Sequence, residues 1–114
     1  MTNDQAACRD AYRRLVTRWD AARHNPRTAN RLFDELQQLY KQLRDSPEGR
    51  AAISSLLEDS DRAVRLAAAT HSILWDPATS EAALELLEQG DDLHAVTAKW
   101  TLRTYRDGRL NLDW

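Results

Sequence analysis

The sequence predicts an all-α domain, in which a helical hairpin is followed by two further helical hairpins in a short α-solenoid of about six helices. Three observations carry this prediction. Apolar residues recur at steps of three and four, the spacing of a helix with one buried face. Proline follows a helix-capping residue at three places. Two segments thirty residues apart carry matching residues.

The first 46 residues predict a hairpin of two helices. One helix runs from about Asn3 to His24, and Asn25 followed by Pro26 marks the start of the next, because proline lacks the N–H that a helix start leaves unpaired. The apolar stripe of the first helix is Cys8, Tyr12, Leu15, Trp19 and Ala22. That of the second is Ala29, Leu32, Phe33, Leu36, Leu39, Tyr40 and Leu43.

The same start signal recurs at Ser46–Pro47 and Asp76–Pro77. Gly90 and Gly108 stand where a left-handed residue would end a helix. This punctuation predicts four more helices, which form the repeat pair of residues 47–108, and a tail over 109–114. The expected helices cover 47–58, 61–74, 78–89 and 91–106.

A shift of thirty residues lays Leu56-Leu57-Glu58 on Leu86-Leu87-Glu88, and Asp61 on Asp91. Residues 53–68 resemble a HEAT repeat, in which an Asp and a Val-Arg pair follow a leucine-rich first helix. The resemblance implies that Val64 packs between helices, that Arg65 bonds to nearby acidic groups or helix ends, and that Ala67 and Ala68 permit close helix approach. In the second pair, Leu93-His94-Ala95 replaces the Val-Arg step, as in a distorted or capping repeat.

A longer stretch, about residues 25–112, is similar to a bacterial family of small HEAT-like helical proteins. The resemblance rests on Ala29-Asn30-Arg31-Leu32, Pro47-Glu48-Gly49-Arg50, Val64-Arg65-Leu66-Ala67-Ala68-Ala69-Thr70-His71 and Ala98-Lys99-Trp100-Thr101-Leu102. No function is known for that family, so the resemblance implies a fold and a bacterial source but no reaction.

Composition limits the compartment and the partners. The 114 residues suit one domain, and Cys8 is the single cysteine, so the chain forms no internal disulfide and fits the reducing cytoplasm. We expect neither a signal peptide nor a membrane span. Residues 1–50 hold 10 basic and 7 acidic residues (net +3), and residues 51–114 hold 6 and 11 (net −5). The acidic half opposes contact with phosphates, so a nucleic-acid partner is not expected.

The strongest surface pattern is a pair of acidic turns. Each stands before a predicted helix of one repeat, and in a stacked pair the two would be neighbours. Such an edge can steer a basic protein towards the chain, although Asp is also common at helix starts for capping alone. The residues are Glu58, Asp59 and Asp61 in the first turn, and Glu88, Asp91 and Asp92 in the second.

Four tryptophans are candidate core or contact residues. Trp19 and Trp100 stand on apolar stripes, since Trp100 follows Val96 by four residues, and this favours core packing. Trp75 closes a helix and Trp114 ends the chain, so either could be an exposed anchor. The tail could also fold back and cap the last hairpin.

Catalytic and metal-binding motifs are not apparent. The adjacent carboxylates Asp34 and Glu35 point about 100° apart on a helix and cannot flank one bond. The three histidines and the one cysteine match no zinc spacing. Thr70 and His71 could line a groove, but a structural role is expected. We therefore predict no enzyme, no cofactor and no metal.

These observations favour a protein-binding module, specifically an immunity-type protein that neutralises a basic bacterial toxin or effector domain by occlusion. The predicted contact residues are the six carboxylates with Trp75 and Trp114. The alternatives are a regulatory scaffold or a self-associating module, and a nucleic-acid role for the arginine-rich first helices. The arginines concerned are Arg9, Arg13, Arg14, Arg18, Arg23, Arg27 and Arg31.

Overall fold

The computed structural model describes residues 3–113, which form six helices and no strand, and it confirms the all-α class. The helices pack into two compact units, the first ending at Leu56 and the second beginning at Leu57. The helices are α1 (Asn3–Ala21), α2 (Pro26–Leu43), α3 (Pro47–Ser54), α4 (Arg62–Ser72), α5 (Pro77–Glu88) and α6 (Leu93–Arg106). In the described range no helix is long and apolar enough to cross a membrane.

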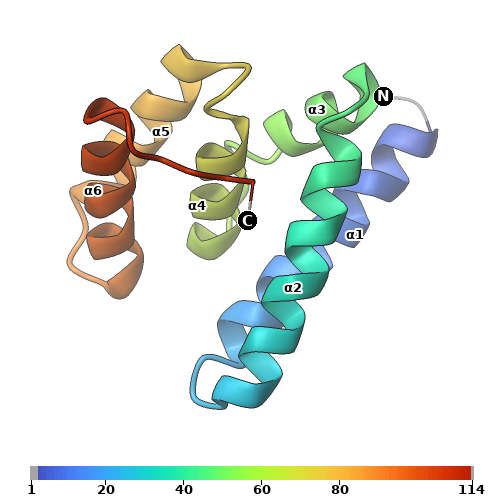
Figure 1. Cartoon of the computed structure of the whole chain (residues 1–114), viewed down its shortest axis with the longest axis horizontal. Coiled ribbons are helices and arrows are strands. Elements are labelled where there is room, and N and C mark those ends of the chain that lie inside the picture. Colours follow the sequence, from blue (N-terminus) through green and yellow to red (C-terminus); the bar gives the residue numbers. More distant parts are fainter. Residues whose placement is uncertain (1–2, 114) are drawn as a thin grey trace. The chain divides into compact units, whose positions relative to one another are not determined.

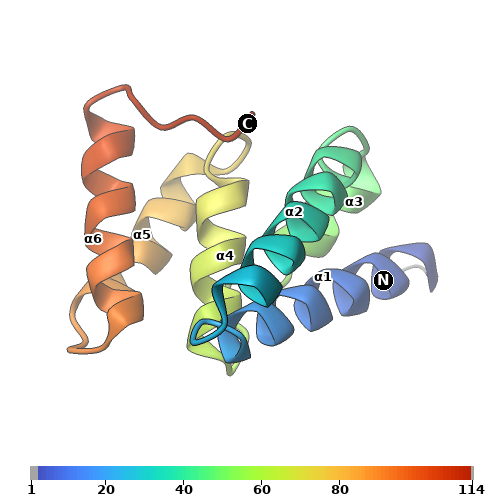
Figure 2. The same cartoon turned by 60° about the horizontal axis from the view of Figure 1, so that its bottom comes forward.

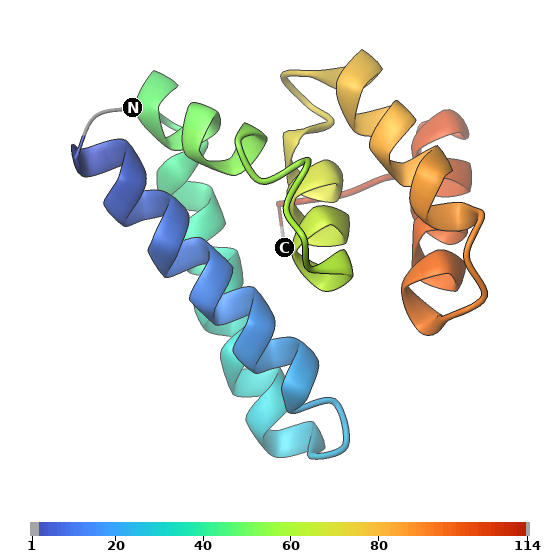
Figure 3. The same ribbon diagram turned by 180° about the vertical axis from the view of Figure 1, so that it is seen from behind.

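In the first unit, α1 and α2 run side by side in opposite directions, and α3 packs against both (Figure 3). Tyr12 and Tyr40 are fully buried in this hairpin. The cap predicted at Asn25 is present, because its side-chain oxygen accepts a hydrogen bond from the N–H of Thr28. Trp19 packs its ring against Phe33 of α2 at 6.2 Å between centroids, so its expected structural role is supported.

The start of α3 lies very close to the end of α2. Ser46 caps α3 by accepting a hydrogen bond from the N–H of Gly49 at 3.0 Å. Gly49 is buried, and a Cβ atom there would overlap the backbone carbonyl of Leu43. Glycine at this position therefore allows the two helix ends to approach closely. The helix ends at Ser54, four residues earlier than predicted, because the chain then enters a turn.

In the second unit, α4 and α6 run in the same direction and α5 runs back between them (Figures 1 and 2). Fully buried Val64 and Ala68 lie on α4, as the HEAT resemblance implies for these positions. The hydroxyls of Ser72 and Ser80 join α4 to α5 with a buried hydrogen bond of 2.7 Å. The tail after α6 runs back towards α4, and Leu112 is buried there (Figure 1).

Of three local predictions about helix ends, one is confirmed and two need correction. Gly108 has the left-handed conformation expected after a helix, with φ of 73°. Gly90 does not have a left-handed conformation. A Cβ atom there would lie 2.6 Å from the Arg62 guanidinium, so the glycine leaves space for that side chain. Asp76 precedes α5 as expected, but its side chain makes no capping hydrogen bond.

Candidate functional site

The first acidic turn, between α3 and α4, is organised by its own carboxylates. Asp61 caps α4, because its Oδ1 accepts hydrogen bonds from the N–H groups of Ala63 at 2.8 Å and Val64 at 3.2 Å. Asp59 accepts a hydrogen bond from the N–H of Asp61 at 3.0 Å. Glu58 is exposed. Two of the three predicted contact residues in this turn therefore hold the backbone in place.

The second acidic turn, between α5 and α6, has a similar division. Asp92 caps α6 by accepting a hydrogen bond from the N–H of Ala95 at 2.9 Å. Asp91, next to it, is exposed, and Glu88 is half-buried at the end of α5. Nδ1 of His94 lies 3.4 Å from Oδ2 of Asp92. The capping role again falls to one carboxylate of the group.

Arg62 links the two turns. Its Nε donates to Oδ2 of Asp92 at 2.6 Å, and its Nη2 donates to Oδ1 of Asp92 at 2.8 Å and to the Leu87 carbonyl at 3.2 Å. The starts of α4 and α6 therefore lie together. These guanidinium hydrogen bonds, with the N–H of Ala95, hold the pKa of the Asp92 carboxyl well below its ordinary value.

The six predicted carboxylates thus fall into two groups. Asp59, Asp61 and Asp92 are committed to caps, turns and the Arg62 pair. The carboxylates of Glu58, Glu88 and Asp91 make no hydrogen bond or ion pair with another residue in the range 3–113. A protein that contacts this edge would meet mainly the second group, which we call the open carboxylates.

Trp75 is half-buried in the turn after α4, where its backbone N–H donates to the Ser72 carbonyl at 3.1 Å. Trp114 lies outside the described residues.

Thr70 and His71 fit the structural role expected of them, because the Thr70 hydroxyl donates to the Leu66 carbonyl at 2.8 Å and His71 is buried.

The prediction that Trp100 packs in the core is wrong. Trp100 is 57% exposed, and Leu93 and Val96, the residues that set its stripe, are 67% and 52% exposed. The Arg103 guanidinium stacks over the Trp100 ring at 5.0 Å from the ring centroid. Helical spacing showed correctly that these residues share one face of α6, but this face is not packed against the rest of the described chain.

A shallow hollow of about 290 Å³ lies beside this face, between α5 and α6. It is lined by three cations, two carboxylates and one leucine, namely Lys99, Arg103, Arg106, Glu88, Asp107 and Leu102. Arg106 is already paired there, donating to Glu85 at 2.6 Å and to Glu81 at 3.3 Å. The second half of α6 is therefore basic although the C-terminal half of the chain is acidic.

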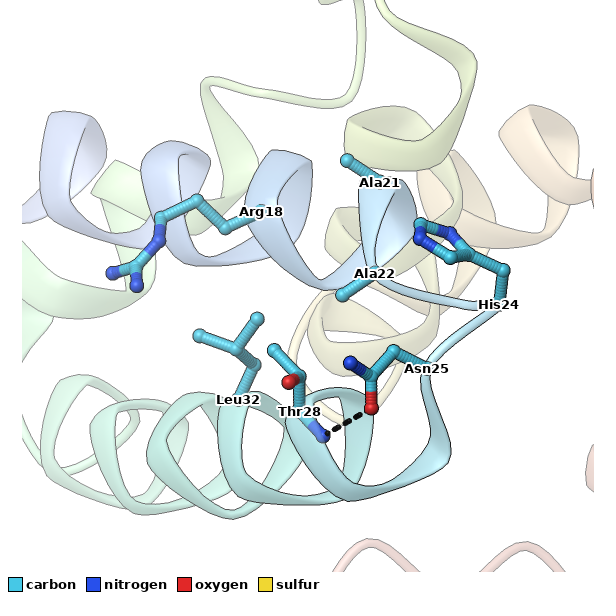
Figure 4. A pocket seen from close by; sticks show the side chains of 7 residues that line it. All are labelled: Arg18, Ala21, Ala22, His24, Asn25, Thr28 and Leu32. Carbon is cyan, nitrogen blue, oxygen red and sulfur yellow. Dashed lines mark hydrogen bonds between the residues drawn. The ribbon is translucent and has the colours of Figure 1, made fainter.

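A further pocket of about 340 Å³ lies in the first unit, at the turn between α1 and α2 (Figure 4). Its walls are Arg18, Ala21, Ala22, His24, Asn25, Thr28 and Leu32. The Asn25 side-chain oxygen is engaged in capping, 3.3 Å from the Thr28 nitrogen, and Arg18 and His24 are exposed. The pocket therefore lacks a set of polar groups that converge on one ligand atom.

Metal-ligating residues do not cluster in the described part of the chain. No group of three or more histidine, cysteine, aspartate or glutamate side chains has the geometry to hold an ion among residues 3–113. Cys8 is half-buried on α1.

Comparison with known proteins identifies one similar fold. The chain is similar to the crystal structure of the protein RPA1889 from Rhodopseudomonas palustris CGA009, with a TM-score of 0.84 and 23% sequence identity. The match covers 97% of this chain and 93% of the other. No family model and no curated protein matches the sequence. At this identity the likeness shows a shared fold and carries no function.

Proposed function

We propose that the chain is a non-catalytic protein-binding module that contacts its partner through the second unit. One observation carries this proposal. Every large apolar side chain that is exposed among residues 3–113 belongs to that unit. Leu93, Val96 and Trp100 stand at helical spacing on one face of α6, and adjoining exposed apolar side chains are typical of protein contacts. The side chains are Leu74, Leu86, Leu93, Val96 and Trp100.

In its specific form, the proposal is an immunity-type protein that acts in the cytoplasm and neutralises a basic toxin by covering it. The open carboxylates Glu58, Glu88 and Asp91 would attract the basic partner and align it, because exposed charges of one sign speed the approach of a protein of opposite charge. Half-buried Trp75 would be the aromatic anchor. The bond between Arg62 and Asp92 supports this form, since it holds both turns at one edge.

The experiment is a pull-down of the tagged chain from its native lysate at low and high salt. The test variant is Glu58→Gln, Glu88→Gln, Asp91→Asn, which removes the open charges and leaves the caps at Asp61 and Asp92 intact. The control variant, Asp34→Asn, Glu35→Gln, Glu48→Gln, removes three exposed carboxylates from the first unit.

We expect one basic protein to be captured in stoichiometric amount by the wild type and by the control, and to be lost from the test variant and at high salt. A Trp75→Ala variant should also weaken capture. Capture of an acidic protein or of nucleic acid, or equal capture by the test variant, would contradict the immunity form. No capture by any version would contradict the whole proposal.

A further inference from the structure

The exposed face of α6 forms a continuous apolar stripe. Leu93, Val96, Trp100 and Arg103 follow one another at steps of three, four and three residues, so at about 100° per residue they share an arc of roughly 80°. The first three are more than half exposed, and Arg103 lies over the Trp100 ring. We call these four residues the α6 stripe.

The positions on α4 that correspond to the first two residues of the α6 stripe are buried. The thirty-residue offset that aligns Asp61 with Asp91 also aligns Ala63 with Leu93 and Leu66 with Val96. Ala63 and Leu66 are 2% and 4% exposed, whereas the α6 residues, which are larger, are 67% and 52% exposed. A face that is buried on one helix of the repeat is thus left open on the other, with more apolar surface to cover.

Charge is distributed unevenly along α6. The helix contains no acidic residue, and its lysine and arginines stand from its middle to its end, Lys99 at the centre and Arg103 and Arg106 in the last turn. Its start is preceded by the acidic Glu88, Asp91 and Asp92. The helix dipole is positive at the start and negative at the end of α6. The acidic residues before the start and the basic residues near the end therefore also stabilise the helix. The stripe is therefore an apolar surface with an acidic end and a basic end.

We propose that the α6 stripe is a self-association surface, on which a second copy of this chain packs its own α6 in antiparallel orientation about a two-fold axis. With the axis near residue 98, Val96 of each copy faces Trp100 of the other, and Leu93 faces the aliphatic part of Arg103. An isologous contact of this kind uses one patch twice and closes at the dimer.

Charge selects the antiparallel orientation. A parallel pair would place Arg103 and Lys99 of the two copies side by side, which is repulsive. The antiparallel pair places the basic end of each helix beside the acidic start of the other. Asp91 is exposed without an ion-pair partner among the described residues, and Arg103 stacks only on its own Trp100. These two residues are therefore the pair available to join the copies.

This inference rests on the proposed function only in taking the exposed apolar side chains of the second unit as a protein contact. Its test uses the purified chain alone, whereas the proposed function is tested by capture of another protein. A chain that stays monomeric but captures a basic protein would overturn the inference and leave the proposed function standing.

The first measurement is the mass of the purified full chain by sedimentation equilibrium, from about 1 to about 500 µM, because one helix per chain gives an interface at the low end of the usual size range. We expect the mass to rise from 13.1 kDa towards twice that value. Trp100→Ala should remain monomeric throughout. Leu74→Ala, which removes an equally exposed leucine from the turn after α4, should behave as wild type.

The second measurement tests orientation by exchanging charge. Arg103→Glu and Asp91→Arg should each weaken dimerisation at least tenfold, since each homodimer then contains two like-charge contacts. An equimolar mixture of the two variants should dimerise again, because in the mixed pair both contacts join opposite charges. Monomeric wild type, dimerisation of Trp100→Ala, or failure of the mixture to recover would each overturn the proposal.

Discussion

Arg62 and Asp92 are thirty residues apart in the sequence and form a two-pronged ion pair at 2.6 and 2.8 Å. The pair joins the first residue of α4 to the capping residue of α6. Asp92 therefore does two things at once, because it satisfies the start of its own helix and holds the start of another. The position of the acidic edge depends on this residue more than on the exposed carboxylates around it.

The pair predicts a loss of stability in acid that depends on Asp92. The folded pKa of Asp92 lies below its ordinary value of 3.8, so its contribution is present above that pH and is lost as pH falls through the folded pKa. Asp92→Asn keeps a capping side chain but removes the charge. Its melting temperature should be lower than that of wild type at neutral pH, and the difference should shrink below about pH 4.

Thermal unfolding followed by circular dichroism from about pH 7 to about pH 2 would measure this difference. Asp91→Asn is the matched control, because Asp91 lies beside Asp92 but makes no hydrogen bond within residues 3–113. A constant difference between wild type and Asp92→Asn across the whole pH range would contradict the prediction.

Gly49 predicts a steric effect in the first unit. A Cβ atom there would overlap the Leu43 carbonyl, which belongs to backbone and cannot rotate away. Gly49→Ala should therefore lower the free energy of unfolding by about 1–3 kcal/mol or more, the range seen for overpacked sites. Urea unfolding measures this loss.

Gly108→Ala gives a useful comparison. Nothing lies within 4 Å of the added Cβ, but φ is 73°, so the cost there is backbone strain of about 1–2 kcal/mol. Gly108→Asn should recover part of that loss, because asparagine tolerates the left-handed conformation. Gly49→Asn should recover none of the unfolding free energy lost in Gly49→Ala. Equal recovery at both glycines would show that the steric argument for Gly49 is wrong.

Helix number and most helix starts could be predicted from the sequence because their signals are local. Asn25, Ser46 and Asp61 each cap the helix that follows, and each stands within three residues of the N–H that it binds. The last helix was expected from residue 91, but α6 begins at Leu93 with Asp92 as its cap. The exposure of Trp100 could not be predicted in this way. Spacing shows that residues share a helix face, but whether another element covers that face depends on packing between distant segments.

Gly90 illustrates the same limit. A glycine after a helix suggests a left-handed residue, yet its function here is to leave room for the Arg62 guanidinium. The ion pair between Arg62 and Asp92 was not predicted either, although the thirty-residue offset aligns the two helix starts. The offset was a signal that could have drawn attention to Arg62, the basic residue beside the first acidic turn.

Tyr12 predicts a loss of stability in alkali. Burial, with a smaller effect from the charge of Tyr40, raises the pKa of Tyr12 well above 10.0. The unfolded chain therefore ionises first, and stability present below about pH 10 is lost as pH rises towards the folded pKa. Tyr12→Phe cannot ionise and should lose less stability than wild type between about pH 9 and about pH 11.

Urea midpoints measured across that range would test the alkaline prediction. Tyr105→Phe is the matched control, since Tyr105 is only partly buried and lies on α6 in the second unit. Parallel pH profiles for wild type and Tyr12→Phe, with a constant offset between them, would show that Tyr12 does not cause the alkaline loss.

The buried hydroxyls of Ser72 and Ser80 predict strong coupling between α4 and α5. Each is fully buried, and the two oxygens are 2.7 Å apart. Ser72→Ala or Ser80→Ala alone leaves the other hydroxyl without this partner and should cost about 1–3 kcal/mol of unfolding free energy. The double variant removes both polar groups and should cost much less than the sum of the two single changes.

A double-mutant cycle by urea unfolding gives the coupling directly. We expect a coupling of about 1 kcal/mol or more, since the two hydroxyls are buried and an unpaired hydroxyl is costly there. Ser54→Ala and Ser60→Ala provide a control pair, because both serines lie nearer the surface on either side of the turn between α3 and α4. If the costs of Ser72→Ala and Ser80→Ala simply add, the hydrogen bond does not hold α4 to α5, and the apolar contacts between these helices must do so.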